Sequence, residues 1–556
     1  MRKTITMMLT AMIALGTAAQ DATFSYFKYT GNDERFSKQI DANKEFMNPI
    51  LAGFYPDPAI CRKGDTFYLV NSSFTFYPGV PIFESKDLVN WQQIGHVLNR
   101  ESQLQLQGQR VSGGIYAPAI SYNERNQTFY MITTNVGKGG NFYVKTKDPH
   151  QGWSDPIYLP KVDGIDPSFL FDTDGKAYIV HNAPVYGQAA YDGQRAIRLL
   201  EFDVKGDTII GEPTEIVRGG THVTEKPIWI EGPHLYHIGK YYYLMCAEGG
   251  TAEGHSEVIF RAKSPMGPWE ENPKNPILTQ RNLSDDRAER VTCTGHADLI
   301  QTSKGDWWAV FLGCRPYEEN MYNTGRETFL LPVIWKDGWP EILESGKAVP
   351  TIVAKKNLSP LTSHLSPLTS NFSYTDRFDS QELHPRWLFL RNPPAKAYTL
   401  SAEGLKLHPS TGSHRKRKAL SALFCRQQHT TFVAETELSF KPSLNRQLAG
   451  FLLFQNEQHN IVFGKTILNN RPALVVKRTQ KEEETIIASC FLPADDVVRL
   501  KVEADGRFYS FYYTRGTGDN WQPLVIGVDG SNLSTARSGG FIGAMIGLYA
   551  TRSDKP

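Results

Sequence analysis

The chain has 556 residues, of which 40% are hydrophobic and 21% charged, and its formal net charge is +2. These values are typical of a folded protein with two or more domains and argue against a largely disordered chain. The sequence shows no basic footprint of the kind that nucleic-acid-binding proteins carry. The densest basic run is His414-Arg415-Lys416-Arg417-Lys418, which we interpret as a solvated loop.

The first nineteen residues differ from the rest of the chain. Arg2 and Lys3 precede an apolar run over residues 5–15, and small residues follow at 16–19. This pattern predicts a secretory signal peptide over residues 1–19 and not a membrane span. No cysteine follows closely, which argues against a lipid anchor. We therefore expect an exported protein of the periplasm or the extracellular space.

The six cysteines are scattered among apolar residues, without CxxC pairs or a dense framework. Buried free thiols are the simpler interpretation. A disulfide between Cys293 and Cys314 is the alternative in an oxidising compartment.

A repeated unit organises residues 49–350. Each copy has a small or acidic residue beside a proline or alanine, then a short apolar strand, a polar turn and an aromatic-rich strand. When Pro58, Pro118, Pro167, Pro233 and Ala297 are taken as equivalent points, successive copies are 60, 49, 66 and 64 residues apart. Such intervals fit four-stranded sheets, and five of these in a ring form a five-bladed β-propeller. Aromatic residues of the outer strands are expected to pack between blades.

The segments that flank the propeller are predicted to differ from it. Residues 20–48 are polar and irregular, and we expect a strap that leads to the first blade. Residues 351–371 contain a near-duplicated Leu-Ser-Pro-Leu-Thr-Ser sequence and are predicted to form a linker. Residues 372–556 alternate apolar and polar residues over many short strands, which predicts a two-sheet β-sandwich. The expected fold class is therefore all-β.

Three of the five copies begin with a carboxylate: Asp57, Asp166 and Glu231. We interpret these as equivalent innermost positions, which a propeller brings together near its axis. A single Asp beside Pro more often only opens a turn. Three like charges near one axis, however, repel one another and lose water, which raises at least one pKa and is usually met at sites that use it. One protonated and one ionised carboxyl group are what glycoside hydrolysis requires.

These motifs, in this order, resemble glycoside hydrolase family 43, in its β-xylosidase and α-L-arabinofuranosidase branch with a C-terminal concanavalin-like sandwich. The resemblance covers nearly the whole chain after the signal peptide, and the set of motifs is far more specific than any one of them. The motifs are Gly53-Phe54-Tyr55-Pro56-Asp57-Pro58, Pro78-Gly79-Val80-Pro81-Ile82-Phe83, Lys86-Asp87-Leu88-Val89-Asn90-Trp91, Gly164-Ile165-Asp166-Pro167-Ser168, Glu231-Gly232-Pro233-His234-Leu235-Tyr236, Thr294-Gly295-His296-Ala297-Asp298 and Gly325-Arg326-Glu327-Thr328-Phe329.

The resemblance implies an inverting hydrolase. Asp57 would be the general base that activates a water molecule, and Glu231 the general acid that protonates the leaving group. Asp166 would be the third carboxylate, which tunes the pKa of Glu231 and holds it in orientation.

The resemblance also implies that Phe74, Tyr116, Ile165, His296 and Arg326 line the sugar site. From the residues alone, Arg326 could instead pair with its neighbour Glu327 on the surface, and His296 and Phe74 could be ordinary core residues. Tyr116 stands where relatives usually have Trp, which leaves the sugar preference open. The chemistry requires no cofactor, although His296 could contact, through water, a calcium ion on the propeller axis.

The function expected from these features is release of xylose from the non-reducing ends of β-1,4-xylooligosaccharides. The alternative within the class is an α-L-arabinofuranosidase or an enzyme with both activities. The alternative of another class is a catalytically silent carbohydrate-binding propeller. The expected partner is thus a xylo- or arabino-oligosaccharide, with no nucleic acid and no membrane span, and the sequence does not indicate an oligomeric state.

The sandwich is expected to buttress the pocket, with a separate carbohydrate-binding module as the alternative. Residues 547–551 match the family's late strand, and a further strand is expected after them. Because the chain ends at Pro556, either the sandwich closes differently or one of its edges stays open.

Overall fold

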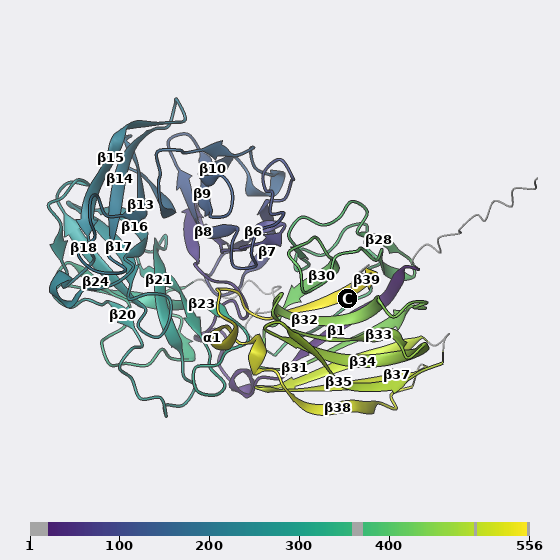
Figure 1. Cartoon of the computed structure of the whole chain (residues 1–556). Coiled ribbons are helices and arrows are strands. Elements are labelled where there is room, and N and C mark those ends of the chain that lie inside the picture. Colours follow the sequence, from purple (N-terminus) through teal and green to yellow (C-terminus); the bar gives the residue numbers. More distant parts are fainter. Residues whose placement is uncertain (1–19, 359–370, 494–496, 517, 553–556) are drawn as a thin grey trace, which may run out of the picture.

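The structure, a computed structural model, describes residues 20–358, 371–493, 497–516 and 518–552. Strands make up nearly all of its regular structure, in two domains that lie side by side (Figure 1). Among the described residues no helix is long and apolar enough to cross a membrane. The predicted signal peptide, residues 1–19, lies outside the described residues.

The first domain is the predicted five-bladed propeller. Each blade is a sheet whose strands follow one another in chain order, and β20 (Leu278–Thr279) adds a fifth strand to blade four. The blades, in chain order, are β3–β4–β6–β7 (Ala59–Lys63, Thr66–Val70, Gly79–Ser85, Gln92–Leu98), β8–β9–β10–β11 (Ile115–Asn123, Thr128–Asn135, Gly140–Thr146, Ile157–Tyr158), β12–β13–β14–β15 (Ile165–Phe171, Ala177–Pro184, Arg195–Asp203, Thr208–Arg218), β16–β17–β18–β19 (Glu231–Ile238, Tyr241–Glu248, Ser256–Ala262, Glu270–Glu271) and β21–β22–β23–β24 (Thr292–Gln301, Trp307–Cys314, Arg326–Lys336, Trp339–Glu341).

Aromatic side chains pack between neighbouring blades, including, as predicted, a ring from an outer strand: Tyr143 of blade two meets Phe169 of blade three edge to face at 5.6 Å. Rings of the inner strands do the same. Tyr68 of blade one meets Phe129 of blade two edge to face, with ring centroids 4.9 Å apart. Tyr130 of blade two meets Phe169 of blade three in the same way at 5.7 Å. Since edge-to-face pairs are a favoured aromatic geometry, these rings stabilise the contacts that hold the blades in a ring.

The second domain is the predicted sandwich of two antiparallel sheets. One sheet has the order β28-β29-β1-β31-β36-β37-β38 (Tyr398–Ser401, Gly404–Leu407, Ala22–Gly31, Thr431–Ser439, Val498–Asp505, Phe508–Arg515, Gln522–Asp529), with β26 (Ser373–Asp376) also beside β1. The other has the order β30-β39-β32-β33-β34-β35 (Ser421–Arg426, Met545–Arg552, Gln447–Asn456, His459–Leu468, Arg471–Gln480, Glu483–Phe491). A single hydrophobic cluster fills the space between the two sheets.

The prediction of an irregular strap at residues 20–48 is wrong for its first part. Ala22–Gly31 form β1, which lies inside the first sandwich sheet, between β29 and β31. A register shift between Phe24 and Phe27 interrupts the pairing of β1 with β31. The two rings are three residues apart and both fully buried, so the bulge breaks the strict alternation that identifies a strand in sequence.

The two ends of the sandwich sequence also differ from expectation. β39, the late strand at Met545–Arg552, is not an edge strand but lies between β30 and β32. The start of the predicted linker is a strand as well, because β25 (Ile352–Ala354) pairs with β2 (Glu45–Met47). This ribbon joins the segments before and after the propeller. The duplicated linker sequence falls largely in residues 359–370, outside the described residues.

The two domains share a hydrophobic core. One cluster combines Phe54, Phe74 and Phe76 of the propeller with residues of the sandwich such as Phe424 and Ile542. A short sheet also crosses the boundary, since β5 (Phe76–Tyr77) pairs with β27 (Phe389–Leu390). This continuous packing is typical of a rigid support and not of a module on a flexible tether.

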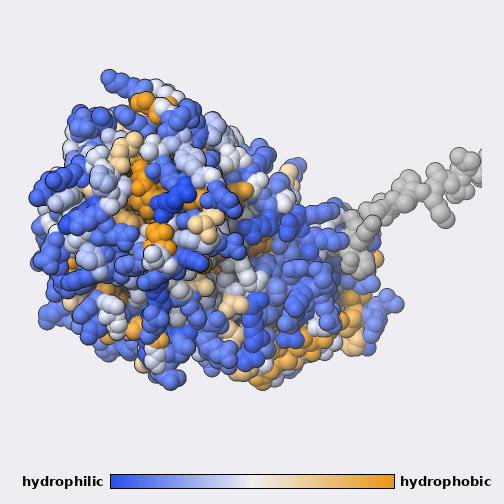
Figure 2. All heavy atoms as spheres, turned by 60° about the vertical axis from the view of Figure 1, so that its left-hand side comes forward, coloured by the Kyte–Doolittle hydropathy of each residue, from blue (hydrophilic) through white to orange (hydrophobic). Residues whose placement is uncertain are grey.

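The face of the molecule seen in Figure 2 is mostly hydrophilic. In the view of Figure 2, hydrophobic side chains gather mainly on part of the propeller and along the lower margin of the sandwich, where Figure 1 places β35 and β38.

All six cysteines are free, which agrees with the simpler interpretation. Cys293 and Cys314 lie on the neighbouring strands β21 and β22 and form a small cluster with Tyr322, without a disulfide. Five of the six are buried, and Cys490 is half-buried.

Candidate active site

The inner strands of all five blades share an unusual backbone feature. The residue just before each equivalent proline or alanine has a left-handed conformation, which non-glycine residues seldom adopt. In four blades the pairing register of the inner strand also shifts there. Such bulges re-aim side chains and are common beside active sites. The five residues, with their φ values, are Asp57 (51°), Ala117 (35°), Asp166 (55°), Gly232 (54°) and His296 (50°).

This ring corrects one expectation about the carboxylates. Glu231 does not occupy the position equivalent to Asp57 and Asp166, because Gly232 does. Glu231 is one residue earlier, where it pairs with Ala247 as Ile165 pairs with Asn182 in blade three. Pro233 is equivalent to Pro58 and Pro167. Its acidic residue, Glu231, lies two positions before the proline and not one, so an alignment of the copies by their acidic residues places Glu231 wrongly.

Gly232 serves the site directly. Its N–H donates a hydrogen bond to Asp166 Oδ2 at 3.2 Å. A Cβ at this position would lie 2.9 Å from the His296 ring, and φ is positive, so both space and backbone conformation favour glycine. Gly232 therefore lets Glu231, Asp166 and His296 approach one another.

Asp57 is a buried carboxylate with three polar neighbours. Ser72 donates a hydrogen bond to Oδ2 at 2.6 Å, Arg326 Nη1 lies 3.3 Å from Oδ1, and His296 Nδ1 lies 3.8 Å from Oδ1. Burial acts to raise the pKa of Asp57, but the Arg326 charge and the Ser72 hydrogen bond outweigh it and hold the pKa below its usual value. Asp57 is therefore ionised at neutral pH.

Glu231 and Asp166 have the opposite character. Burial, followed by the negative charge of Asp166, raises the pKa of Glu231 well above its usual value. Burial, followed by the charge of Asp57, raises the pKa of Asp166 to about 7. The three carboxyl groups thus influence one another directly. The pKa values of Glu231 and Asp57 are therefore shifted in opposite directions, so that Glu231 favours its protonated form and Asp57 its ionised form.

Arg326 connects the carboxylates to an aromatic wall. Its guanidinium lies over the Phe541 ring, 5.3 Å from the centroid. Phe541 stacks on Phe74 with centroids 6.0 Å apart and meets Tyr116 edge to face at 5.8 Å. The surface pairing of Arg326 with Glu327 does not occur, since Glu327 is fully buried and bound by Arg315.

The predicted sugar-site residues do not all have the same exposure. Phe74 is 1% exposed and belongs to the core shared by the domains, so it supports the wall from behind. Tyr116 is half-buried, and its hydroxyl donates to the Ser112 carbonyl at 2.6 Å. Ile165 is half-buried beside Asp166. Burial lowers the pKa of His296 to about 4, so this histidine is neutral.

The propeller axis offers little room for a metal ion. A cavity of about 10 Å³ lies there, lined by Asp57, Asp166, His234, His296 and the small residues beside them, and this is about the space that one water molecule needs. Calcium takes six to eight oxygen ligands. No group of three or more His, Cys, Asp or Glu residues in the described parts of the chain is arranged to hold a metal. These residues do not fit a calcium ion, and no step below involves one.

Several residues at the site were not predicted. Ser72 lies in the Ser72-Ser73-Phe74 sequence, and only its neighbour Phe74 was recognised. Arg195 moderates the raised pKa values of Glu231 and Asp166 and lies over the exposed ring of Trp229, 5.1 Å from its centroid. Phe541 comes from the sandwich. Arg195 and Phe541 are far from the motifs in sequence, so no local pattern marks them.

Comparison with known proteins identifies the family of both domains. Residues 46–340 match the family model described as glycosyl hydrolases family 43, and residues 375–556 match the β-xylosidase C-terminal concanavalin A-like domain. The chain is 40% identical over 519 residues to a xylosidase/arabinosidase of Butyrivibrio fibrisolvens, with 91% of this chain and 96% of the relative covered. It is 36% identical over 519 residues to a non-reducing end α-L-arabinofuranosidase of Bacteroides ovatus, with 92% of each covered.

A solved structure shows the same architecture. A GH43_12 protein retrieved from a capybara gut metagenome has a TM-score of 0.87 and 43% identity, with 95% of this chain and 99% of that chain covered. With its propeller, its sandwich and its buried carboxylates in place, the chain belongs to glycoside hydrolase family 43.

Proposed function

We propose that this glycoside hydrolase releases xylose from the non-reducing ends of β-1,4-xylooligosaccharides with inversion at the anomeric carbon. The observation that carries the proposal is the presence in one site of two buried carboxyl groups, Asp57 and Glu231, whose pKa values are shifted in opposite directions. The family supports it, since relatives carry the names xylosidase/arabinosidase and β-xylosidase. Family membership and the presence of all three carboxylates argue against a silent binding propeller.

In this mechanism Asp57 takes a proton from a water molecule, whose oxygen attacks the anomeric carbon. Glu231 gives its proton to the glycosidic oxygen as the bond to the leaving group breaks. Asp166 acts through Glu231, because its negative charge favours the protonated form of that acid. Asp57 keeps the charge it needs through Arg326 and Ser72.

Leaving-group dependence tests these roles. A general acid is needed in proportion to the basicity of the leaving group. We therefore expect Glu231→Ala to lose most activity on xylobiose and least on an activated aryl xyloside, whereas Asp57→Ala should be severely impaired on both. Equal impairment of Glu231→Ala on every leaving group would contradict the assignment.

The configuration of the first product tests the stereochemistry. Proton NMR of a hydrolysis mixture should show α-xylose before mutarotation. Early appearance of β-xylose would exclude water activation by Asp57.

A second candidate activity is α-L-arabinofuranoside hydrolysis, by itself or beside xylosidase activity. Two observations favour it: the printed names of the relatives at 40% and 36% identity include arabinosidase or arabinofuranosidase, and Tyr116 stands where Trp is expected. The ratio of kcat/KM for 4-nitrophenyl β-D-xylopyranoside and α-L-arabinofuranoside decides between the two. A ratio well below one would make the arabinofuranosidase the main activity.

We also propose export of the protein after removal of residues 1–19. The charged start, apolar run and small residues of this segment support the proposal. N-terminal sequencing of protein recovered from the periplasm or the medium should find a chain that begins near Gln20. Recovery of the full chain from the cytoplasm alone would contradict it.

A further inference from the structure

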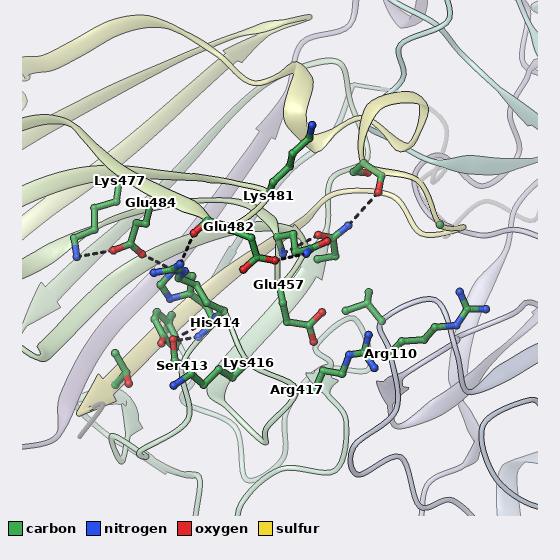
Figure 3. A pocket seen from close by; sticks show the side chains of 18 of the residues that line it. Arg110, Ser413, His414, Lys416, Arg417, Glu457, Lys477, Lys481, Glu482 and Glu484 are labelled. Carbon is green, nitrogen blue, oxygen red and sulfur yellow. Dashed lines mark hydrogen bonds and ion pairs between the residues drawn. The ribbon is translucent and has the colours of Figure 1, made fainter. Parts of the chain in front are cut away.

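A large basic cleft lies next to the active site, between the propeller and the sandwich. Its volume is about 890 Å³, within the range of sites that bind small molecules, which often lie at domain interfaces. The propeller contributes Arg110, Val111 and Ser112, and the sandwich contributes the remaining lining residues. The basic run at residues 414–418, predicted to be a solvated loop, supplies part of one wall (Figure 3).

The lining carries a marked excess of positive charge. Seven arginine and lysine residues line the cleft, against three glutamates. Two of these glutamates already have partners, since Glu457 pairs with Arg391, and Glu484 lies 3.2 Å from Lys477 and 3.1 Å from His414. In the described residues, no carboxylate lies within ion-pair distance of five of the cations: Arg110, Lys416, Arg417, Arg446 and Lys481.

Cations gathered in a cleft without carboxylate partners repel one another, so an anion there would relieve the repulsion. In Figure 3, Arg417 lies beside Glu457, with Arg110 of the propeller on one side of it and Lys416, next to Ser413, on the other.

The cleft and the active site meet at one short segment. Gly540 lines the cleft, while the next residue, Phe541, touches Arg326 and Tyr116 in the active site. The Phe541 N–H donates to Ser112 Oγ at 2.9 Å, and Ser112 also lines the cleft. Arg110, on the cleft side, donates to the Tyr116 hydroxyl at 3.2 Å. The segment at residues 540–541 therefore forms part of the boundary between the cleft and the active site.

We propose that the cleft binds acidic oligosaccharides. The group that it binds is a hexuronic acid substituent on the same oligosaccharide whose non-reducing end occupies the active site. Arginine and lysine supply the charge-assisted hydrogen bonds that a carboxylate takes. The side chains of Ser413, Asn445, Asn456 and Gln458 line the same space and offer partners for sugar hydroxyls. This inference rests on the proposed glycosidase function and adds a preference for acid-substituted substrates.

The test compares xylooligosaccharides of equal length with and without a glucuronic acid substituent. We expect kcat/KM to be higher for the acidic substrate, and the ratio of the two values to fall as ionic strength rises. In Lys416→Ala/Arg417→Ala the ratio should drop by roughly tenfold, since each exposed charge contact contributes modestly, while activity on the neutral substrate stays unchanged. Arg446→Ala should lower the ratio in the same direction.

Matched controls separate this effect from a general loss of charge. Lys205→Ala/Lys263→Ala removes two exposed lysines from the propeller that have no carboxylate partner in the described residues, and its ratio should equal that of the wild type. Binding of the acidic oligosaccharide to the Asp57→Ala variant by calorimetry gives a measure independent of turnover, and it should weaken when the Lys416 and Arg417 changes are added.

Three outcomes would overturn the inference. These are equal kcat/KM for acidic and neutral substrates, a preference that survives in Lys416→Ala/Arg417→Ala, and displacement of the acidic oligosaccharide by inorganic phosphate as readily as by free glucuronic acid at equal ionic strength. Inactivity of the wild type on both substrates, with the acidic oligosaccharide still bound in the cleft, would instead reject the proposed hydrolase activity.

Discussion

Replacement of Arg326 by methionine tests how Asp57 keeps its negative charge. Nη1 of Arg326 lies 3.3 Å from Asp57 Oδ1, and both side chains are buried. At an effective dielectric constant of about 20, two unit charges at this separation attract by about 5 kcal/mol. The cost of removing both groups from water cancels part of this attraction. Contacts of this kind typically move a carboxyl pKa by about one to three units, which corresponds to about 1.4–4 kcal/mol.

Without Arg326, burial is opposed by His296 and by the Ser72 hydrogen bond, which are weaker than the Arg326 charge. The pKa of Asp57 should therefore rise. A general base acts only when it is ionised, so the acidic limb of the kcat/KM profile should move to higher pH. The proton concentration at which half of the activity is reached should fall by roughly tenfold or more, which is a shift of about one pH unit or more. Loss of sugar contacts would lower the rate at every pH without moving this limb.

The assay is the pH dependence of kcat/KM on an activated aryl xyloside for the wild type, Arg326→Met and Arg326→Lys. Lysine keeps the charge but lacks the planar fork of the guanidinium, so Arg326→Lys should move the limb back part of the way. An acidic limb in Arg326→Met at the wild-type position, whatever the absolute rate, would refute the reasoning.

Three further predictions concern the same site. In Asp166→Asn the negative charge that helps to raise the pKa of Glu231 is lost, so the alkaline limb of the pH profile should move to lower pH, and an unmoved limb would contradict the tuning role. Phe541→Ala removes one cation–π contact and two ring contacts, together about 2 kcal/mol, and should lower the free energy of unfolding by about that amount and also lower kcat/KM, because the wall beside Arg326 is lost; an unchanged kcat/KM would show that the sandwich does not shape the pocket. Treatment with EDTA should leave kcat/KM within about twofold of its starting value, and recovery of a lost activity by calcium alone would show that an ion is needed.

The propeller and its carboxylates could be predicted because their signals are local. Each copy of the repeat carries its own inner strands and turn, so the blades are recognisable one at a time. The strand β1 was missed because the bulge near Phe24 hides its alternation. Glu231 was placed one step wrong because the left-handed position belongs to Gly232.

The residues that the sequence did not reveal reach the site from far along the chain. Phe541 is 215 residues from Arg326, which it contacts, and Arg195 comes from an outer strand of blade three. Nothing in the composition around either residue differs from that of an ordinary loop or strand. Only the packing of the two domains brings Phe541 to the carboxylates.

The position of Arg326 depends on the contact between the domains. On one side of it, Gly325 lies so close to Gly543 of the sandwich that an added Cβ would be 2.7 Å from the Gly543 backbone. On the other side, Glu327 is bound by Arg315 and accepts a hydrogen bond from the N–H of Gly53 at 2.7 Å.

Arg315 also pairs with Asp33, in the segment that joins β1 to the propeller, at 2.8 Å. Both neighbours of Arg326 are therefore fixed by contacts that extend beyond its own blade. Since the Arg326 charge lowers the pKa of Asp57, the sandwich affects Asp57 through the backbone as well as through Phe541. A domain with this role cannot be exchanged as an independent binding module without a change in the chemistry of the propeller.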